Sequence, residues 1–239
     1  MLEVDFHSHT FFSKCGIHTH MELLLRAREL GLKGLAITDH GPALKSRVTS
    51  LVFTRTTNPL SGIRFIKGME CNVVDDKGGI DAPKRHLKHM DLILLGLHPN
   101  IETKKKPEEY TKLLITAIEK NPCIDIITHP NEKDYLVDFE PLANAAKKRG
   151  IALELNNSKS LYDRSPPEVT RSLICTCKNV GCPMAIGSDA HSLEEIGLDD
   201  SVKPFLIEED FPEDLLVNSN AEKAFAFIEG RKNNKIVEQ

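Results

Sequence analysis

The sequence lacks several features that would each point to a class of protein. It has no tryptophan, and aromatic residues make up only 5% of its 239 residues. Its longest apolar stretch, residues 92–97, is far shorter than the roughly 20 residues needed to cross a bilayer. Charged Glu3 and Asp5 follow Met1 and Leu2 with no apolar segment between them, so we predict no secretory signal peptide. We therefore expect no contact with membranes.

Cysteine and charge exclude further classes. Six cysteines in 239 residues are too few for a disulfide scaffold, and no two of them form a C-x-x-C pair typical of a zinc ribbon. We accordingly expect a reducing, cytoplasmic location. The 35 acidic and 31 basic residues nearly balance, at a net charge of −4, which argues against long nucleic acid as a partner.

What is present is a regular alternation of short apolar runs and segments of helical periodicity, with no internal repeat and no flexible linker. The runs predict strands at 4–6, 35–37, 63–69, 92–97, 124–127, 151–155 and 184–186, and the periodic segments predict helices at 21–30, 107–119, 141–149, 167–180 and 221–228. Continuous apolar strands separated by helices are typical of a parallel sheet that is buried on both faces.

This pattern predicts a single α/β domain over residues 1–239. We expect a closed or nearly closed barrel over about 3–191 and a C-terminal cap over about 193–239. An open doubly wound sheet is the alternative, but its glycine-rich phosphate loop is missing, because the first strand runs into His7-Ser8-His9.

Histidine is the one unusual count, with 10 residues, and polar residues of similar type follow all of the predicted strands. Barrel enzymes place their chemistry at the carboxyl ends of the strands, where the loops converge. Each residue alone is a weak signal, but their recurrence at equivalent places predicts a metal cluster. The candidate ligands are His7, His9, His40, Glu70, His98, His129, Asp189 and His191.

The candidate ligands favour particular metals and a particular reaction. Imidazole with carboxylate suits Zn²⁺, Mn²⁺ or Fe²⁺ better than Ca²⁺ or Mg²⁺, and eight candidates exceed what one tetrahedral ion can use. We therefore expect two to three ions per chain, zinc above all, with Glu70 as a bridge. Such ions activate bound water for hydrolysis. No protein nucleophile is needed, and Ser8 and Ser188 lie outside a G-x-S-x-G turn.

Seven motifs occur in order between residue 5 and about residue 191. They are Asp5-x-His7-x-His9, Thr38-Asp39-His40-Gly41-Pro42, Gly68-x-Glu70-x-Asn72, Gly96-x-His98, His129-Pro130, Leu153-Glu154-x-Asn156-Asn157-Ser158 and Gly187-Ser188-Asp189-x-His191. This series resembles that of the PHP (polymerase and histidinol phosphatase) superfamily, in particular its YcdX-type branch of small stand-alone phosphatases.

The resemblance implies a distorted (β/α)7 TIM-like barrel that holds three divalent ions, zinc or manganese, and hydrolyses phosphate esters. By the same resemblance, one ion would take His7, His9, Glu70 and Asp189. A second would take His40, His191 and a residue of the loop after the first strand. A third would take His98 and His129, with Glu70 bridging.

One position departs from the YcdX-type pattern. That branch places a histidine six residues after the second histidine of H-x-H, and here this residue is Cys15. A Cys15 thiolate is one possible replacement, because thiolate binds zinc well. A reshaped loop that brings in His18 is the other, and we favour His18. Loss of this ligand would leave a two-metal enzyme.

Three further residues have open roles. Asp5 shares the strand parity of His7, so it either orients an imidazole or is a buried structural acid. Asn156 either contacts substrate or caps the following turn. Arg164 lies eight residues beyond Asn156 and is a candidate for gripping a phosphate group, although a solvated surface arginine is the simpler interpretation.

The sequence thus predicts a cytoplasmic, metal-dependent phosphatase that attacks a small phosphomonoester with metal-bound water. The first alternative is a phosphodiesterase or short-oligonucleotide nuclease of the same superfamily. The others are an amidohydrolase, which also opens with H-x-H on a barrel, and a metal-binding protein that has lost catalysis.

Overall fold

The computed structural model describes residues 1–100 and 105–235, and its centre is a sheet of seven parallel strands. Each strand pairs with the next along the chain, and a bridge between Ser8 and Ala190 brings the ends of the first and last strands together. The strands are β1 (Val4–Asp5), β2 (Gly34–Ile37), β3 (Arg64–Asn72), β4 (Leu92–Gly96), β5 (Ile126–Ile127), β6 (Ala152–Asn156) and β7 (Met184–Gly187). The predicted α/β barrel of seven strands is thereby confirmed.

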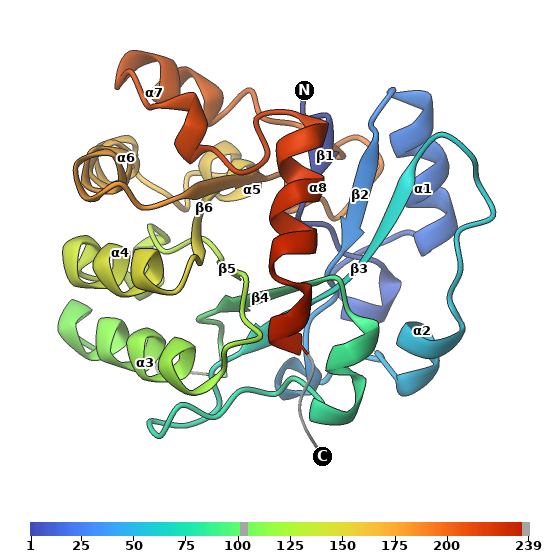
Figure 1. The fold of residues 1–239 in the computed structure, drawn as a ribbon, viewed down its shortest axis with the longest axis horizontal. Coiled ribbons are helices and arrows are strands. Elements are labelled where there is room, and N and C mark those ends of the chain that lie inside the picture. The colour runs from blue at the N-terminus through green and yellow to red at the C-terminus, as the bar shows by residue number, and fades with distance from the viewer. Residues whose placement is uncertain (101–104, 236–239) are drawn as a thin grey trace.

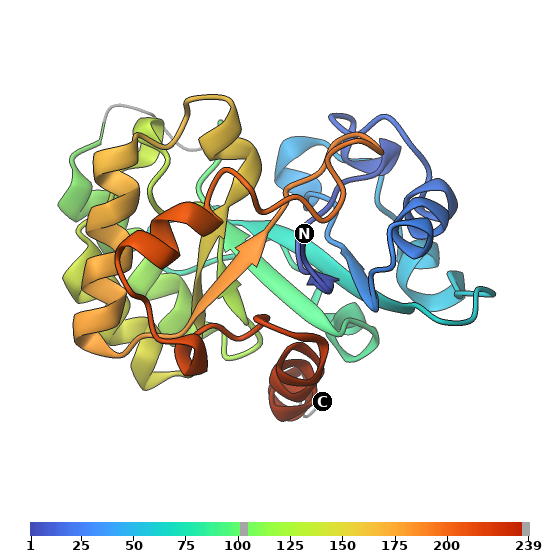
Figure 2. The ribbon, with the colours of Figure 1, turned by 90° about the horizontal axis from the view of Figure 1, so that it is seen from above.

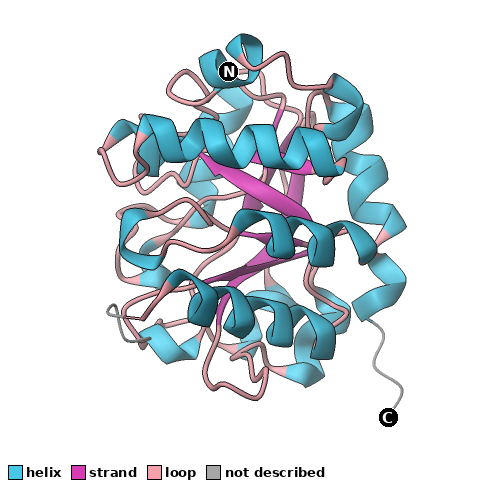
Figure 3. Ribbon diagram, turned by 90° about the vertical axis from the view of Figure 1, so that its left-hand side faces the viewer, coloured by secondary structure: helices cyan, strands magenta, loops and turns pink. Residues whose placement is uncertain are grey.

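Helices cover the outside of this barrel (Figure 1). Three of them, α3, α4 and α6, lie side by side as one layer over the strands (Figure 3), whereas α1 and α2 lie on the opposite side. The helices are α1 (His20–Glu29), α2 (Ser50–Arg55), α3 (Pro107–Lys120), α4 (Phe139–Lys148), α5 (Asn157–Leu161), α6 (Pro167–Val180), α7 (Lys203–Glu208) and α8 (Ala221–Gly230).

Local sequence signals explain where the long helices begin and end. Thr19 and Glu22 form a capping box at the start of α1, in which each side chain satisfies a backbone N–H of the other. At the end of α6, Gly181 adopts φ 72°, a left-handed conformation that glycine reaches without steric cost. All five predicted helices are present. Residues 50–55, 157–161 and 203–208 form helices of only five or six residues that the periodicity did not predict.

The inside of the barrel is filled by small and branched apolar side chains, and its base is covered by α8. Val4, Phe6 and Ile66 belong to an interior cluster that also includes Ala224 and Ile228 of α8. Figure 2 shows α8 beneath the strands, on the side away from their carboxyl ends. The amphipathic segment predicted at 221–228 therefore packs across the base, while the carboxyl ends of the strands stay available for a site.

A buried ionic network fixes the chain just after α8. Arg231 donates from Nε to Asp125 Oδ1 at 2.7 Å, and Lys235 Nζ lies 2.9 Å from Asp125 Oδ2. All three residues are less than 10% exposed. Because a buried carboxylate is costly without cationic partners, these two cations stabilise Asp125 at the start of β5.

Among the helices of the described residues, none has the length and apolar character needed to span a bilayer.

Candidate metal centre

All eight residues that we expected as ligands lie at the carboxyl ends of the strands, and the chain folds them towards one point. Three groups have potential ligand atoms within 4.8 Å of one another, and together they include six of the eight. The groups are His7 with His9 and Asp189, His40 with Glu70 and His98, and His9 with Cys15 and His40. The other two, His129 and His191, contact Glu70 and Asp189 respectively.

Glu70, at the end of β3, is the centre of this group. Its Oε1 lies 3.0 Å from His98 Nε2 and 3.1 Å from His129 Nε2. Its Oε2 lies 2.8 Å from His40 Nδ1, and His7 and His9 are only slightly further away. The carboxylate thus has imidazoles on both of its oxygens, which is the geometry a bridging ligand requires.

Four imidazoles have Nδ1 turned to an acceptor, and in His7, His9 and His129 the Nε2 atom faces the cluster. His7 Nδ1 donates to Glu154 Oε1 at 2.7 Å, and His9 Nδ1 donates to Ser13 Oγ at 2.9 Å. His129 Nδ1 lies 3.1 Å from Glu132 Oε2, and His191 Nδ1 donates to the carbonyl oxygen of Asp189. Such outer hydrogen bonds select the tautomer that offers Nε2 to a metal.

Several buried atoms at the centre have no hydrogen-bond partner. Glu70 Oε2 and His40 Nδ1 are buried and only 2.8 Å apart, yet no hydrogen bond of good geometry joins them. His98 Nδ1 is buried with no hydrogen-bond partner among the described residues. The Nε2 atoms of His7 and His9 lie 3.0 Å apart, each with its lone pair or proton facing the other. Orphaned donors and acceptors are rare in protein interiors. The residues therefore fit divalent cations, which would satisfy imidazole, carboxylate and thiolate together.

The electrostatics of the centre reflect the same crowding. Burial opposes charge on His7, but the carboxylates of Glu154, Asp189 and Glu70 outweigh it and raise its pKa well above the usual value. Burial also opposes the charge of Glu70 and by itself would raise its pKa. The facing imidazoles, His98 first among them, outweigh burial and bring the pKa of Glu70 well below the usual value. Glu70 is thus an anion in this environment, ready to bind a cation.

Cys15 occupies the position that the motif comparison left open. Its thiol forms one group with His9 and His40, and it hydrogen bonds to His191 and His40. Burial raises the pKa of Cys15, but these two imidazoles outweigh burial and lower it to about 6. His18, which we favoured, belongs to none of the groups among the described residues. The geometry therefore favours Cys15 over His18.

Two members of the cluster have strained backbones. His129 has φ 32° and Asp189 has φ 55°, both in the left-handed region that residues other than glycine seldom adopt. Such conformations cost energy and persist where the surroundings impose them, often at functional sites. In these conformations the side chain of His129 lies against Glu70, and that of Asp189 lies against His9.

Contacts that the sequence could not show bear on two of the open roles. Asp5 accepts hydrogen bonds from the backbone N–H groups of His7, Ser188 and Gly197 and from the Ser188 hydroxyl, and does not touch the ring of His7. Among the described residues, Glu154 and not Asp5 hydrogen bonds to the ring of His7, so these contacts favour Asp5 as a buried structural acid. Asn156 accepts from the backbone N–H of Lys159 and caps α5.

Arg164 lies at the candidate site, but its guanidinium is engaged by the protein. It lines the cleft described below and pairs with Glu132 and Asp134. Asn156 likewise donates from Nδ2 to Glu154 at 3.0 Å and to Asp189 at 3.2 Å. The suggested contacts of Arg164 and Asn156 with substrate stay predictions.

Sequence reasoning missed the residues that hold the ligands in place. Glu154, Glu132 and Ser13 each support an imidazole, and Lys159 lies beside Asp189 and Glu132. Glu154 alone carried a signal, because it occurs in one of the seven motifs. Gly187 belongs to the same arrangement, since a Cβ at this position would collide with the Glu154 carboxylate.

The cluster lies in a cleft of about 420 Å³. His40, Glu70, His98, His129, Asp189 and His191 line it together with Cys15, Lys159 and Arg164, and Leu44, Leu97, Pro99 and Tyr135 add apolar surface. One wall is therefore polar and metal-binding in character, and the rest can contact an organic group. The volume suits a small molecule.

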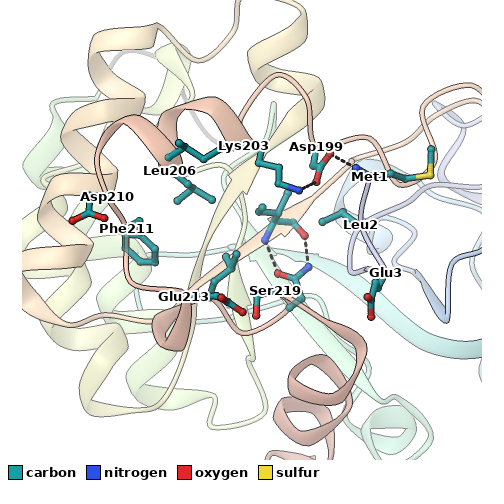
Figure 4. A pocket seen from close by; sticks show the side chains of 14 residues that line it. Met1, Leu2, Glu3, Asp199, Lys203, Leu206, Asp210, Phe211, Glu213 and Ser219 are labelled. Atoms are coloured by element: carbon teal, nitrogen blue, oxygen red, sulfur yellow. Dashed lines mark hydrogen bonds and ion pairs between the residues drawn. The ribbon is translucent and has the colours of Figure 1, made fainter.

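A second hollow, of about 610 Å³, lies between the start of the chain and α7 (Figure 4). There the amino group of Met1 lies 2.6 Å from Asp199, and Leu206 and Phe211 supply apolar surface. It shares no lining residue with the cleft at the cluster among those described. Its greater size does not make it the active site, because the titratable cluster lies elsewhere.

Comparison with known proteins agrees with the geometry. The model of the PHP domain family matches residues 5–158, which is more than half of the chain. The chain belongs to the PHP domain family. Two curated relatives, from Acetivibrio thermocellus and Caldicellulosiruptor bescii, are each named "Probable phosphatase". They are 34% and 36% identical to this PHP protein, over 96% and 95% of both chains respectively.

A solved structure shares the fold. It is the histidinol phosphate phosphatase of Lactococcus lactis, determined with zinc, L-histidinol and phosphate. The alignment has a TM-score of 0.59 at 16% identity and covers 95% of this PHP protein and 93% of that chain. The family predicted from the motifs is confirmed, and the predicted enzyme class agrees with the names of the relatives.

Proposed function

We propose that this PHP protein is a metal-dependent phosphatase that hydrolyses a small phosphomonoester at a multinuclear metal centre. The observation that carries the proposal is the group of imidazoles around the buried carboxylate of Glu70, open to a cleft of about 420 Å³. The names of relatives that align over nearly the whole chain support the same reaction.

The residues that would hold the ions are those in contact around Glu70. Glu70 would bridge, and zinc is the metal that this set of imidazoles, carboxylates and one thiol favours, with manganese or iron as alternatives. The proposed ligands are His7, His9, Cys15, His40, Glu70, His98, His129, Asp189 and His191. The geometry gives three neighbouring groups, so two to three ions per chain are expected.

Divalent ions at this centre would lower the pKa of bound water and neutralise charge on the phosphoryl group during its transfer. The side chains of the protein itself position the metal-binding imidazoles. Glu154 and Ser13 fix the rings of His7 and His9, and Glu132 fixes His129. Leu97, Pro99 and Tyr135 exclude water from part of the cleft and offer apolar contact to the organic group of the ester. We propose no protein nucleophile.

The test is hydrolysis of p-nitrophenyl phosphate against its bis-ester, with zinc, manganese or iron(II) loaded into chelator-treated protein. We expect the monoester to be preferred and two to three ions per chain by elemental analysis. His98→Gln should lose most of the activity, while His89→Gln, an exposed histidine outside the cluster, should keep it. Preference for the bis-ester would make the protein a phosphodiesterase. Inactivity at all loadings despite bound metal would leave a metal-binding protein.

The remaining expectations about partners and location also stand as proposals. A cleft of this size suits a small phosphate ester, and the net charge of −4 gives no attraction to long nucleic acid. We propose a cytoplasmic protein, because thiolate in Cys15 needs a reducing environment to bind metal.

A further inference from the structure

Lys159 lines the cleft beside Asp189. It belongs to α5, which begins directly after β6, so its side chain starts at the carboxyl end of the sheet. The side chain is only 14% exposed and lies beside two carboxylates. Its Nζ is 3.6 Å from Asp189 Oδ2 and 3.8 Å from Glu132 Oε2.

The ammonium group of Lys159 has donors to spare. Both carboxylates lie beyond hydrogen-bond distance, and within the described part of the chain Nζ donates no hydrogen bond. A lysine ammonium is charged at neutral pH. Here two carboxylates hold it at a distance, at the edge of the cleft.

Arg164, a second cation near Glu132, is differently placed. Its guanidinium pairs with Glu132 and Asp134, and its side chain is 42% exposed. Glu132 in turn contacts His129. Arg164 thus serves to hold Glu132 in place, whereas the donors of Lys159 are unused. An anion that enters the cleft next to Asp189 would meet the ammonium of Lys159 first.

We propose that Lys159 binds the phosphoryl group of the substrate, donating from Nζ to a non-bridging oxygen. The proposal rests on the function proposed above, because it takes the ligand of the cleft to be a phosphate ester. A monoester dianion offers three non-bridging oxygens, so one can face Lys159 while others face the metal centre. A diester offers only two and carries one negative charge fewer, so the ammonium of Lys159 should bind a monoester more strongly.

The experiment measures binding of inorganic phosphate by calorimetry to the full chain, loaded with zinc and then desalted. We expect Lys159→Gln to weaken phosphate binding about 10- to 100-fold, the usual effect of losing a hydrogen bond from a charged donor. Lys159→Arg should recover part of the loss. Lys133→Gln, at an exposed lysine outside the cleft, should bind as the unchanged protein does.

Two further measurements exclude a purely structural role. Zinc content should be unchanged in Lys159→Gln, and the ratio of activity on p-nitrophenyl phosphate to that on the bis-ester should fall. Phosphate affinity within twofold of the unchanged protein, or loss of zinc, would overturn the proposal. The proposed function fails separately, if the unchanged protein binds phosphate through Lys159 but hydrolyses neither ester.

Discussion

Glu154 and His7 form a hydrogen bond of 2.7 Å between Oε1 and Nδ1, entirely buried beneath the cluster. The second oxygen of Glu154 accepts the backbone N–H of His129 at 3.0 Å. One carboxylate from β6 thus positions two of the proposed metal ligands, from β1 and from the end of β5. This contact is the basis of the first prediction.

Replacing Glu154 by glutamine should weaken zinc binding about 10- to 100-fold, as is usual when the outer partner of a metal-binding histidine is changed. An amide has the size of the carboxylate but only one acceptor oxygen, so it cannot satisfy both N–H groups. Competition with a chromophoric chelator measures the affinity. Glu140→Gln, at an exposed glutamate of α4, is the matched control. Equal zinc affinity in the two variants would contradict this assignment.

Cys15 should be the most reactive thiol of the metal-free protein. Because the thiolate is the reactive form, its alkylation by iodoacetamide should rise with pH around a midpoint of about 6, the pKa that His191 and His40 produce against the effect of burial. The pKa of Cys175 is raised by its hydrogen bond to Glu209, so this thiol should react only at higher pH. Mass spectrometry of the alkylated peptides separates the two.

Zinc should protect Cys15 from that reaction if the thiolate is a ligand. One equivalent or more added before iodoacetamide is expected to slow alkylation at Cys15 and leave Cys175 unaffected. A Cys15→Ser variant should bind less zinc than the unchanged protein, and Cys15→His should bind a similar amount. Rapid alkylation at full zinc loading would show that His18 or another residue completes the site.

Removal of metal should lower thermal stability. Without cations, Glu70 Oε2 and His40 Nδ1 are buried without a hydrogen bond of good geometry, and His98 Nδ1 has no hydrogen-bond partner among the described residues. Zinc at 100 times its dissociation constant would add about 2.7 kcal/mol, or roughly 5–10 °C in Tm for a chain of this length. Calorimetric scans with and without chelator test this. The shift should be smaller in His98→Gln than in His89→Gln, and equal shifts would place the bound zinc elsewhere.

The base of the barrel offers a prediction that is independent of metal. Arg231→Met should lower the free energy of unfolding by about 3–5 kcal/mol, because it leaves the buried carboxylate of Asp125 without its nearest cation. Lys232→Met, one residue further on, changes a largely exposed side chain and should cost less than about 0.5 kcal/mol. Urea unfolding measures both. A loss below about 1 kcal/mol for Arg231→Met would mean that Lys235 suffices.

The barrel and the proposed ligands could be predicted because both follow from periodic patterns. Apolar runs such as 92–97 are visible in the sequence, and each is followed by a polar residue whose place at a strand end is set by the topology. The short helices 50–55 and 203–208 could not be found, since six residues give too few turns for a period to show.

The residues behind the ligands were missed for a different reason. Glu132 and Lys159 act through contacts between segments that are separated by 27 residues, and neither has an unusual local pattern. Cys15 was underestimated because the choice between it and His18 depends on how the loop after β1 turns. That turn passes through Lys14 at φ 69° and brings the thiol, not the imidazole, to His40.

The position of α8 under the strands has a consequence for the entry of substrate and the release of product. Because Ala224 and Ile228 of α8 fill the base of the barrel interior, an ester and the phosphate released from it would both use the cleft above Glu70. Product would have to leave this cleft before the next ester could bind. We therefore expect inorganic phosphate to inhibit hydrolysis of the ester competitively.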